Sequence, residues 1–285
     1  MAEVWTIKRL LQWTTEYFKK KQIDAPHLTA ELLLAHVLNK DRLYLYLNYD
    51  QPLNQKELSL FKNLIKRRLK REPLAYILGE QIFFSLSFKV NSSVLIPRPE
   101  TENLVEIALK IIQENYKKPI ILDWGTGSGV IAICLAKRIP KATIFGIDIS
   151  FSALNIAREN AYRHKVKVFF LLTKNFCFKE KTFDVIVSNP PYIETDTIPT
   201  LAPEIQYEPR EALDGGKDGL KYIKYLIIHS HIFLKKNGWL IMEIGYNQAK
   251  AVNKIISSKN WYSPLFFKDD AGHKRVVALR KRGDG

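Results

Sequence analysis

The chain has 285 residues and a mass of 33.0 kDa, enough for two domains, and its 46% hydrophobic and 26% charged residues exclude an intrinsically disordered protein. The longest uncharged apolar run, Val130 to Ala136, has seven residues, whereas a membrane-spanning helix needs about 20. Lys8 and Arg9 also interrupt the apolar stretch that a secretory signal would need. We therefore expect a cytoplasmic protein that does not enter membranes.

Charge and cysteine content narrow the function only slightly. The net charge of +15 would speed encounters with polyanions, but the basic residues are spread along the chain and form no tail. The densest basic run, residues 62–71, has helical apolar spacing and fits either a solvated helix face or a face that docks a partner. The two cysteines lack metal-ligand spacing, so we expect neither a bound metal nor a disulfide framework.

The first part of the chain has helical periodicity. Apolar residues recur every three or four positions, which places them on one side of a helix. This pattern predicts a small all-α domain over residues 1–76, with helices at 4–21, 26–39, 43–47 and 55–71. Short β-type segments at 81–84 and 87–90 then predict a β-hairpin linker over residues 77–96.

Residues 97–285 alternate strand and helix patterns, which predicts an α/β domain whose parallel sheet carries helices on both faces. The final two strands are predicted to form an antiparallel pair. The predicted strands are 120–123, 143–148, 166–172, 183–188, 239–244, 265–268 and 275–279, and the predicted helices are 129–138, 152–164, 220–234 and 248–258.

A glycine-rich loop follows the first of these strands. The strand ends in Asp123 and leads into Gly125-Thr126-Gly127-Ser128-Gly129, where the glycines let a ligand approach the backbone closely. The spacing differs from the dinucleotide pattern and lacks the Lys-Ser/Thr of a phosphate-binding P-loop. Asp148 ends the next strand and can accept hydrogen bonds from both hydroxyls of a ribose. Together these features favour S-adenosylmethionine over NAD.

The tetrapeptide Asn189-Pro190-Pro191-Tyr192 ends a buried strand and indicates the chemistry. The lone pair of a planar nitrogen, in an amide or an exocyclic amino group, is delocalised, so the nitrogen is a poor nucleophile. The Asn189 side-chain oxygen and the Pro190 carbonyl can each accept one N–H and direct the lone pair at an electrophilic methyl group. The two prolines stiffen this pair of acceptors, and Tyr192 offers a ring for stacking.

With these motifs the chain resembles the HemK/PrmC family of methyltransferases, which modify the glutamine of the Gly-Gly-Gln motif in peptide chain release factors. The resemblance covers residues 73–280. It implies a seven-stranded, Rossmann-like, class I methyltransferase domain, S-adenosylmethionine as cofactor and class I release factors as partners. The segments that carry it are Pro73 to Gly79, Leu95 to Glu102, Asp123 to Gly129, Asp148 to Ser150, Asn189 to Ile193, Tyr207 to Pro209 and Lys268 to Asp270.

The resemblance also implies roles for single residues. Gly125, Thr126, Gly127, Ser128 and Gly129 would contact the cofactor, and Asp148 would bind its ribose. Asn189, Pro190, Pro191 and Tyr192 would bind the substrate glutamine, with Asn189, Pro190 and Tyr192 in the catalytic role and Asn189 also beside the transferred methyl. Where the family often has an acidic-aromatic pair near the adenine, this chain has residues 172–176, and Asn175 or a backbone group would serve there.

Two alternatives are consistent with the same residues. The Asn-Pro-Pro-Tyr tetrapeptide is shared with adenine N6-methyltransferases that act on DNA or RNA, and the positive charge suits such substrates. A non-catalytic nucleotide-binding or ribosome-associated module would use the glycine loop only structurally. The segments that flank the tetrapeptide favour the release factor enzyme, for which we expect a monomer and no stable nucleic-acid complex.

Overall fold

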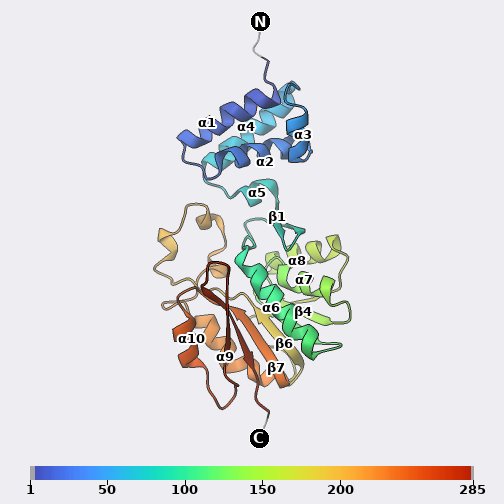
Figure 1. Ribbon diagram of the computed structural model, residues 1–285, viewed down its shortest axis with the longest axis vertical. Coiled ribbons are helices and arrows are strands. Elements are labelled where there is room, and N and C mark those ends of the chain that lie inside the picture. Colours follow the sequence, from blue (N-terminus) through green and yellow to red (C-terminus); the bar gives the residue numbers. More distant parts are fainter. Residues whose placement is uncertain (1–3, 284–285) are drawn as a thin grey trace. The chain divides into compact units, whose positions relative to one another are not determined.

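The computed structural model describes residues 4–283, so residues 1–3 and 284–285, the outermost residues of the predicted first and last domains, lie outside the description. The chain forms two compact units (Figure 1). One consists of residues up to Gly79 together with Pro203–Tyr207, and the other of Glu80–Ala202 together with Glu208 onward. The first unit therefore takes in a short segment from far along the chain that the sequence did not assign to it.

The first unit is helical. Its helices close on a core that includes Phe18, Leu33 and Phe61. Their starts are set by local hydrogen bonds: Thr6 caps the first helix, and Asn54 and Glu57 form a reciprocal capping box at the fourth. The helices are α1 (Ile7–Lys20), α2 (Pro26–Leu38), α3 (Arg42–Leu47), α4 (Gln55–Leu69) and α5 (Leu74–Leu78).

The segment Pro203–Tyr207 is held to the helical unit by α4 and the residues after it. Glu204 accepts a hydrogen bond from the buried Arg68 at 2.9 Å, and Arg71 lies 3.5 Å from the same carboxylate oxygen. The Tyr207 hydroxyl donates to the Lys70 carbonyl at 2.6 Å. Part of the basic run at residues 62–71 is therefore neutralised within the chain.

The second unit begins with a β-hairpin, β1 (Glu80–Phe83) and β2 (Leu86–Lys89). Both strands lie one residue earlier than the sequence predicted. The cause is the two-residue turn, in which Phe84 and Ser85 both have positive φ, a conformation that usually takes Asn or Gly. The Glu102 carboxylate accepts a hydrogen bond from the Phe84 N–H at 2.7 Å and supports this turn.

A seven-stranded sheet in the order β5-β4-β3-β6-β7-β9-β8 forms the centre of the second unit. The five strands from β5 to β7 are parallel, and β9 pairs antiparallel with both β7 and β8, which confirms the predicted terminal pair. The strands are β3 (Ile120–Trp124), β4 (Thr143–Asp148), β5 (Phe169–Leu172), β6 (Phe183–Ser188), β7 (Leu234–Glu243), β8 (Leu265–Lys268) and β9 (Lys274–Arg280).

Helices cover both faces of this sheet because its central strands are apolar on both sides. Ile121, for example, packs in a core with α6 and α7, whereas the adjacent Leu122 packs in a second core with α9 and α10. The longest helix, α6, was not predicted, although its apolar residues recur at helical spacing. The helices are α6 (Glu100–Asn115), α7 (Val130–Arg138), α8 (Phe151–Arg163), α9 (Lys221–Phe233) and α10 (Ala249–Ile255), with 3-10 turns at Ile198–Thr200, Ile205–Tyr207 and Arg210–Ala212.

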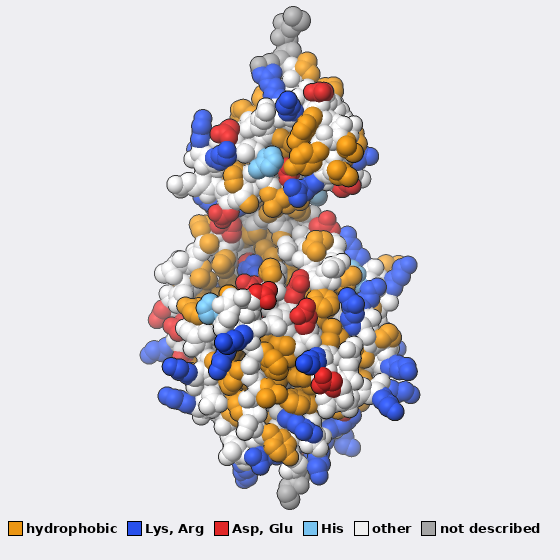
Figure 2. Space-filling view, in the orientation of Figure 1, with side chains coloured by type: hydrophobic (Ala, Val, Ile, Leu, Met, Phe, Trp, Pro, Cys, Tyr) orange, Lys and Arg blue, Asp and Glu red, His pale blue; other side chains and the backbone are white. Residues whose placement is uncertain are grey.

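Basic side chains are spread over the surface, as they are along the sequence. On the face shown in Figure 2, Lys and Arg side chains are spread around the larger unit and do not gather into one patch. Among residues 4–283, no helix is both long enough and apolar enough to cross a membrane.

Candidate active site

The glycine loop connects β3 to α7 at the carboxyl edge of the sheet. Gly125 and Gly127 have φ of +73° and +54°, and a Cβ at either position would meet no atom within 4 Å. These two glycines therefore provide backbone conformation and open space on the ligand side. At Gly129, with φ of +84°, a Cβ would lie 3.2 Å from the Ala157 Cβ, so this glycine permits close packing of α7 on α8.

Asp148 fixes the conformation of the glycine loop. One of its carboxylate oxygens accepts a hydrogen bond from the Gly127 N–H at 2.9 Å, and the other accepts one from the Ser150 N–H at 2.9 Å. Burial raises the pKa of this carboxyl, and the backbone donors oppose that shift. Each oxygen keeps a second lone pair, so the carboxylate can still accept hydrogen bonds from two ribose hydroxyls.

Asp123 lies completely buried beneath the loop. Its Oδ2 accepts hydrogen bonds from the Thr126 hydroxyl at 2.6 Å and from the Ala132 N–H at 3.2 Å, whereas its Oδ1 has no partner. Burial raises the pKa of Asp123 to about 7, and the hydrogen bond from Thr126 lowers it in part. Near neutral pH this group therefore exchanges between the carboxylic acid and the carboxylate.

The pKa of Asp123 predicts a pH dependence of folding. Because the folded-state pKa of about 7 lies above the ordinary value of 3.8, proton uptake stabilises the folded state at low pH, and this contribution is lost as pH rises through 7. The free energy of unfolding should therefore fall by up to about 1.4 kcal/mol per pH unit between pH 4 and 7 relative to Asp123→Asn. Urea unfolding of both proteins across this range measures the difference, and parallel pH profiles would rule out this titration.

The Asn-Pro-Pro-Tyr tetrapeptide follows β6, and side chains from distant segments hold it. The Asn189 amide donates to the Thr101 hydroxyl at 3.0 Å, and Thr101 donates to the Glu243 carboxylate at 2.7 Å. The Tyr192 hydroxyl donates to the other oxygen of Glu243 at 3.0 Å. The Gln248 side chain donates to the Tyr192 carbonyl at 3.0 Å. The tetrapeptide is therefore fixed at both ends.

Gly219 lies directly against the last residue of the tetrapeptide. Its φ is +67°, and a Cβ there would lie 2.5 Å from the Tyr192 carbonyl oxygen. A Cβ on Gly215 would lie 2.8 Å from the Tyr192 Cα. The segment that precedes α9 therefore contacts the tetrapeptide backbone without intervening side chains.

A cavity of about 550 Å³ opens between these two motifs, a size typical of cofactor sites. Of the predicted cofactor and substrate residues, the cavity is lined by Gly125, Gly127, Asp148, Asn189 and Pro191. The other predicted residues do not line the cavity. Thr126 and Ser128 are buried within the loop, and the remaining residues outside the lining are Gly129, Asn175, Pro190 and Tyr192.

Aromatic rings that the sequence did not predict form part of the wall. Trp124 and Tyr222 both line the cavity, with ring centroids 5.8 Å apart. The ring centroids of Trp124 and Tyr225 are 5.9 Å apart, and the Tyr225 hydroxyl oxygen lies 3.4 Å from the Asn175 Oδ1. A tryptophan directly before the glycine loop was the available sequence signal.

Two further segments of the wall are fastened to each other. Ser92 to Leu95 and Pro209 line the cavity. The buried Glu208 carboxylate accepts a hydrogen bond from the Ile96 N–H at 3.0 Å and forms an ion pair with Arg98. Glu208 therefore joins the segment before α6 to the segment after the tetrapeptide.

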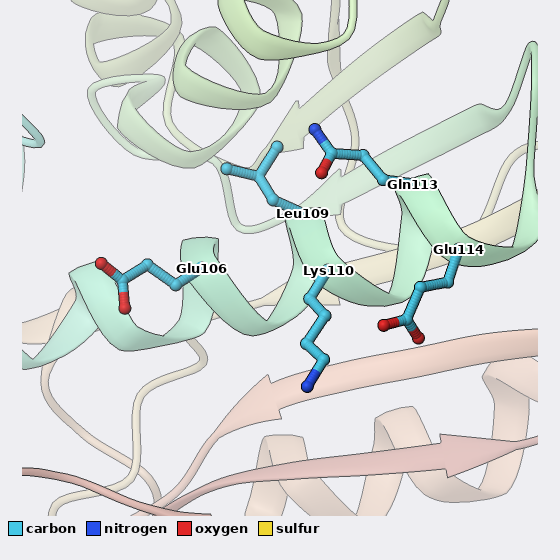
Figure 3. A pocket seen from close by; sticks show the side chains of 5 residues that line it. All are labelled: Glu106, Leu109, Lys110, Gln113 and Glu114. Carbon is cyan, nitrogen blue, oxygen red and sulfur yellow. The ribbon is translucent and has the colours of Figure 1, made fainter.

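A second hollow, of about 430 Å³, lies along α6 and does not bring together residues from different segments of the chain. All its lining side chains come from that helix, and Figure 3 shows Leu109 and Gln113 pointing away from Lys110. Within residues 4–283, no group of three or more His, Cys, Asp or Glu side chains is placed to bind a metal, and Cys134 and Cys177 are free thiols.

The sheet order, the glycine loop and the strand-end tetrapeptide define a Rossmann-like, class I methyltransferase domain, as predicted. A methyltransferase from Pyrococcus furiosus shares this fold, with a TM-score of 0.51 and 19% identity over 78% of this chain and all of that one. A methyltransferase small domain matches residues 102–217, and a PrmC N-terminal domain matches residues 9–79.

Curated relatives match nearly the whole chain. Release factor glutamine methyltransferase of Geobacter sulfurreducens is 43% identical over 98% of both chains, and that of Rhodopirellula baltica is 39% identical over 97% of both. The chain belongs to the release factor glutamine methyltransferase family, which confirms the resemblance identified from its motifs.

Proposed function

We propose that this protein transfers the methyl group of S-adenosylmethionine to the side-chain amide nitrogen of the glutamine in the Gly-Gly-Gln motif of class I release factors. The observation that carries the proposal is the position of Asn189. Asn189 lines the same cavity as the glycine loop and Asp148, and its side-chain amide donates a hydrogen bond to Thr101. Family membership supports the same cofactor and substrate.

The residues present fit S-adenosylmethionine. The open space at Gly125 and Gly127 accommodates a ligand against the backbone, and Asp148 has lone pairs for the ribose hydroxyls. Trp124 and Tyr222 supply an aromatic surface on the same cavity. When bound, the cofactor supplies an electrophilic methyl group on a sulfonium. We propose that Thr126, Ser128, Gly129 and Asn175 also contribute to cofactor binding, with Thr126 acting through its hydrogen bond to Asp123.

The chain's own residues have to orient the glutamine nitrogen. The Asn189 Oδ1 and the Pro190 carbonyl accept its two N–H groups, which turns the lone pair toward the methyl group in line with the breaking bond. Pro191 and Tyr192 complete the substrate contact. No strong base is required, because the nitrogen becomes more acidic as it gains the methyl group. One of its two hydrogen-bonded protons is then lost to water, which leaves a neutral amide with one N–H and one N-methyl group.

The helical unit is the proposed docking domain for the release factor, and the hairpin is the proposed linker to the catalytic domain. We propose a cytoplasmic location, because the proposed substrate acts in translation. We propose a monomer, since a single chain carries both motifs that line the cavity.

One assay tests the proposed function. Purified protein is incubated with methyl-labelled S-adenosylmethionine and, in parallel, a class I release factor, its Gly-Gly-Gln glutamine-to-alanine variant, DNA or RNA. We expect label only in the unmodified release factor. Label in DNA or RNA and none in the release factor would instead support the adenine N6-methyltransferase alternative, and absence of cofactor binding by calorimetry would support a non-catalytic module.

A further inference from the structure

The Asn189 amide can take two orientations that differ by exchange of its oxygen and nitrogen, and only one of them presents an oxygen to the cavity. An acceptor for the substrate N–H groups requires the Oδ1 to face inward. The amide alone does not determine this choice, so a neighbouring group must do so. The contacts of Asn189 lead through Thr101 to Glu243.

The hydrogen-bond directions along this chain follow from the groups themselves. Glu243 is fully buried at the end of β7, and its two carboxyl oxygens accept hydrogen bonds from the Thr101 and Tyr192 hydroxyls. The Thr101 hydroxyl lies 2.7 Å from its Oε2 and has a single proton, which it donates to that oxygen. The Thr101 oxygen can then only accept from Asn189, so the Nδ2 of Asn189 has to face Thr101 at 3.0 Å.

The surroundings of Glu243 support its role as an acceptor. Tyr192 donates its hydroxyl proton to the second carboxylate oxygen at 3.0 Å. Burial raises the pKa of Glu243, and the hydrogen bond from Thr101, the positive charge of Arg275 and the hydrogen bond from Tyr192 oppose that shift, whereas Glu100 adds to it. Arg275 also lies over the Tyr192 ring at 5.7 Å. Two donors and one cation therefore surround the carboxylate.

We propose that Thr101 and Glu243 are positioning residues that set the orientation of the Asn189 amide, with Oδ1 directed to the substrate nitrogen. Neither residue has to touch the substrate or the cofactor. Thr101 belongs to the first turn of α6 and Glu243 to the end of β7, so three distant segments meet at one amide. The expected effect on the rate of methyl transfer rests on the proposed function, whereas the orientation of the Asn189 amide does not.

Thr101→Val tests the inference because it removes only the hydroxyl and keeps the side-chain shape. We expect kcat for methyl transfer to the release factor to fall by about 10- to 100-fold, as expected for a misoriented reacting group. The Kd for S-adenosylhomocysteine should change less than about 3-fold, and Thr101→Ser should restore kcat. If Thr101→Val does not fold, Thr101→Val/Glu243→Gln removes the unpaired charge and gives the same comparison. A kcat equal to that of the unmodified enzyme would overturn the inference.

A second measurement reads the orientation without any substrate. With 15N-labelled asparagine, the side-chain NH2 signal of Asn189, assigned by its loss in Asn189→Ala, should exchange slowly with solvent in the unmodified protein and quickly in Thr101→Val. Equal exchange in both would overturn the inference even if the enzyme is active. Conversely, slow exchange in a protein that does not methylate release factors would uphold the orientation and reject the proposed function.

Discussion

Replacement of Asn189 by alanine should reduce methyl transfer to the release factor by about 1,000-fold or more. Loss of one pre-organised hydrogen-bonding group costs about 100- to 1,000-fold in rate, and a nitrogen misplaced by 1 Å loses about a further 100-fold. In Asn189→Ala the Pro190 carbonyl is left as the single acceptor, so the nitrogen lone pair is no longer directed at the methyl group. Single-turnover transfer from labelled S-adenosylmethionine measures the effect.

The cofactor site should survive this substitution. Asp148 accepts hydrogen bonds from the Gly127 and Ser150 N–H groups, and neither bond involves Asn189. The Kd for S-adenosylhomocysteine should therefore stay within about 3-fold of that of the unmodified protein. Asn253→Ala, which truncates an exposed asparagine on α10, is the matched control and should retain full activity. Activity of Asn189→Ala equal to this control would refute the catalytic role of Asn189.

Asp148→Asn should weaken cofactor binding by about 100-fold or more, whereas Asn189→Ala should leave cofactor binding nearly unchanged. The amide replaces one carboxylate oxygen with an NH2 group, so either the Gly127 or the Ser150 N–H would face a donor in place of an acceptor. The ribose hydroxyls would also lose the charge-assisted hydrogen bonds, each worth about 1.5 to 3 kcal/mol. Titration calorimetry with S-adenosylhomocysteine measures the change.

The charge-matched control for this substitution is Asp50→Asn, at an exposed carboxylate in the helical unit. Its cofactor affinity should equal that of the unmodified protein. An affinity for Asp148→Asn within about 3-fold of this control would contradict the assignment of Asp148 to the ribose. Asn189→Ala and Asp148→Asn together separate positioning of the substrate from binding of the cofactor.

Much of the fold could be predicted because the second unit follows simple periodic rules. Strands such as Thr143–Asp148 and Phe183–Ser188 alternate with helices, and the bounds of these two strands were predicted without error. The hairpin was displaced by one residue because Phe84 and Ser85 adopt a turn conformation that their side chains do not signal. The segment Pro203–Tyr207 has no periodic signal, and its place in the helical unit depends on ion pairs with residues more than 130 positions away.

The site residues that belong to contiguous sequence motifs could be predicted. The residues that the fold brings to these motifs from distant segments could not. Gly125, Asp148 and Asn189 lie at the carboxyl ends of neighbouring parallel strands. Because α/β sheets form their ligand sites at this edge, the three residues could be expected to lie close together. Thr101, Glu243 and Gln248 meet the tetrapeptide only because β6 lies beside β7 and α6 packs across that edge. A carboxylate at the predicted end of β7 was the available signal for Glu243.

In the proposed mechanism, two oxygens accept hydrogen bonds from an unreactive amide nitrogen beside the methyl donor. The most direct test is a crystal structure of this protein with S-adenosylhomocysteine and a Gly-Gly-Gln peptide. We predict that the glutamine side-chain nitrogen lies within about 3.2 Å of both the Asn189 Oδ1 and the Pro190 carbonyl oxygen, with its free side toward the cofactor sulfur. A nitrogen hydrogen-bonded to other groups, or an Asn189 amide that presents its Nδ2 to the glutamine, would contradict this mechanism.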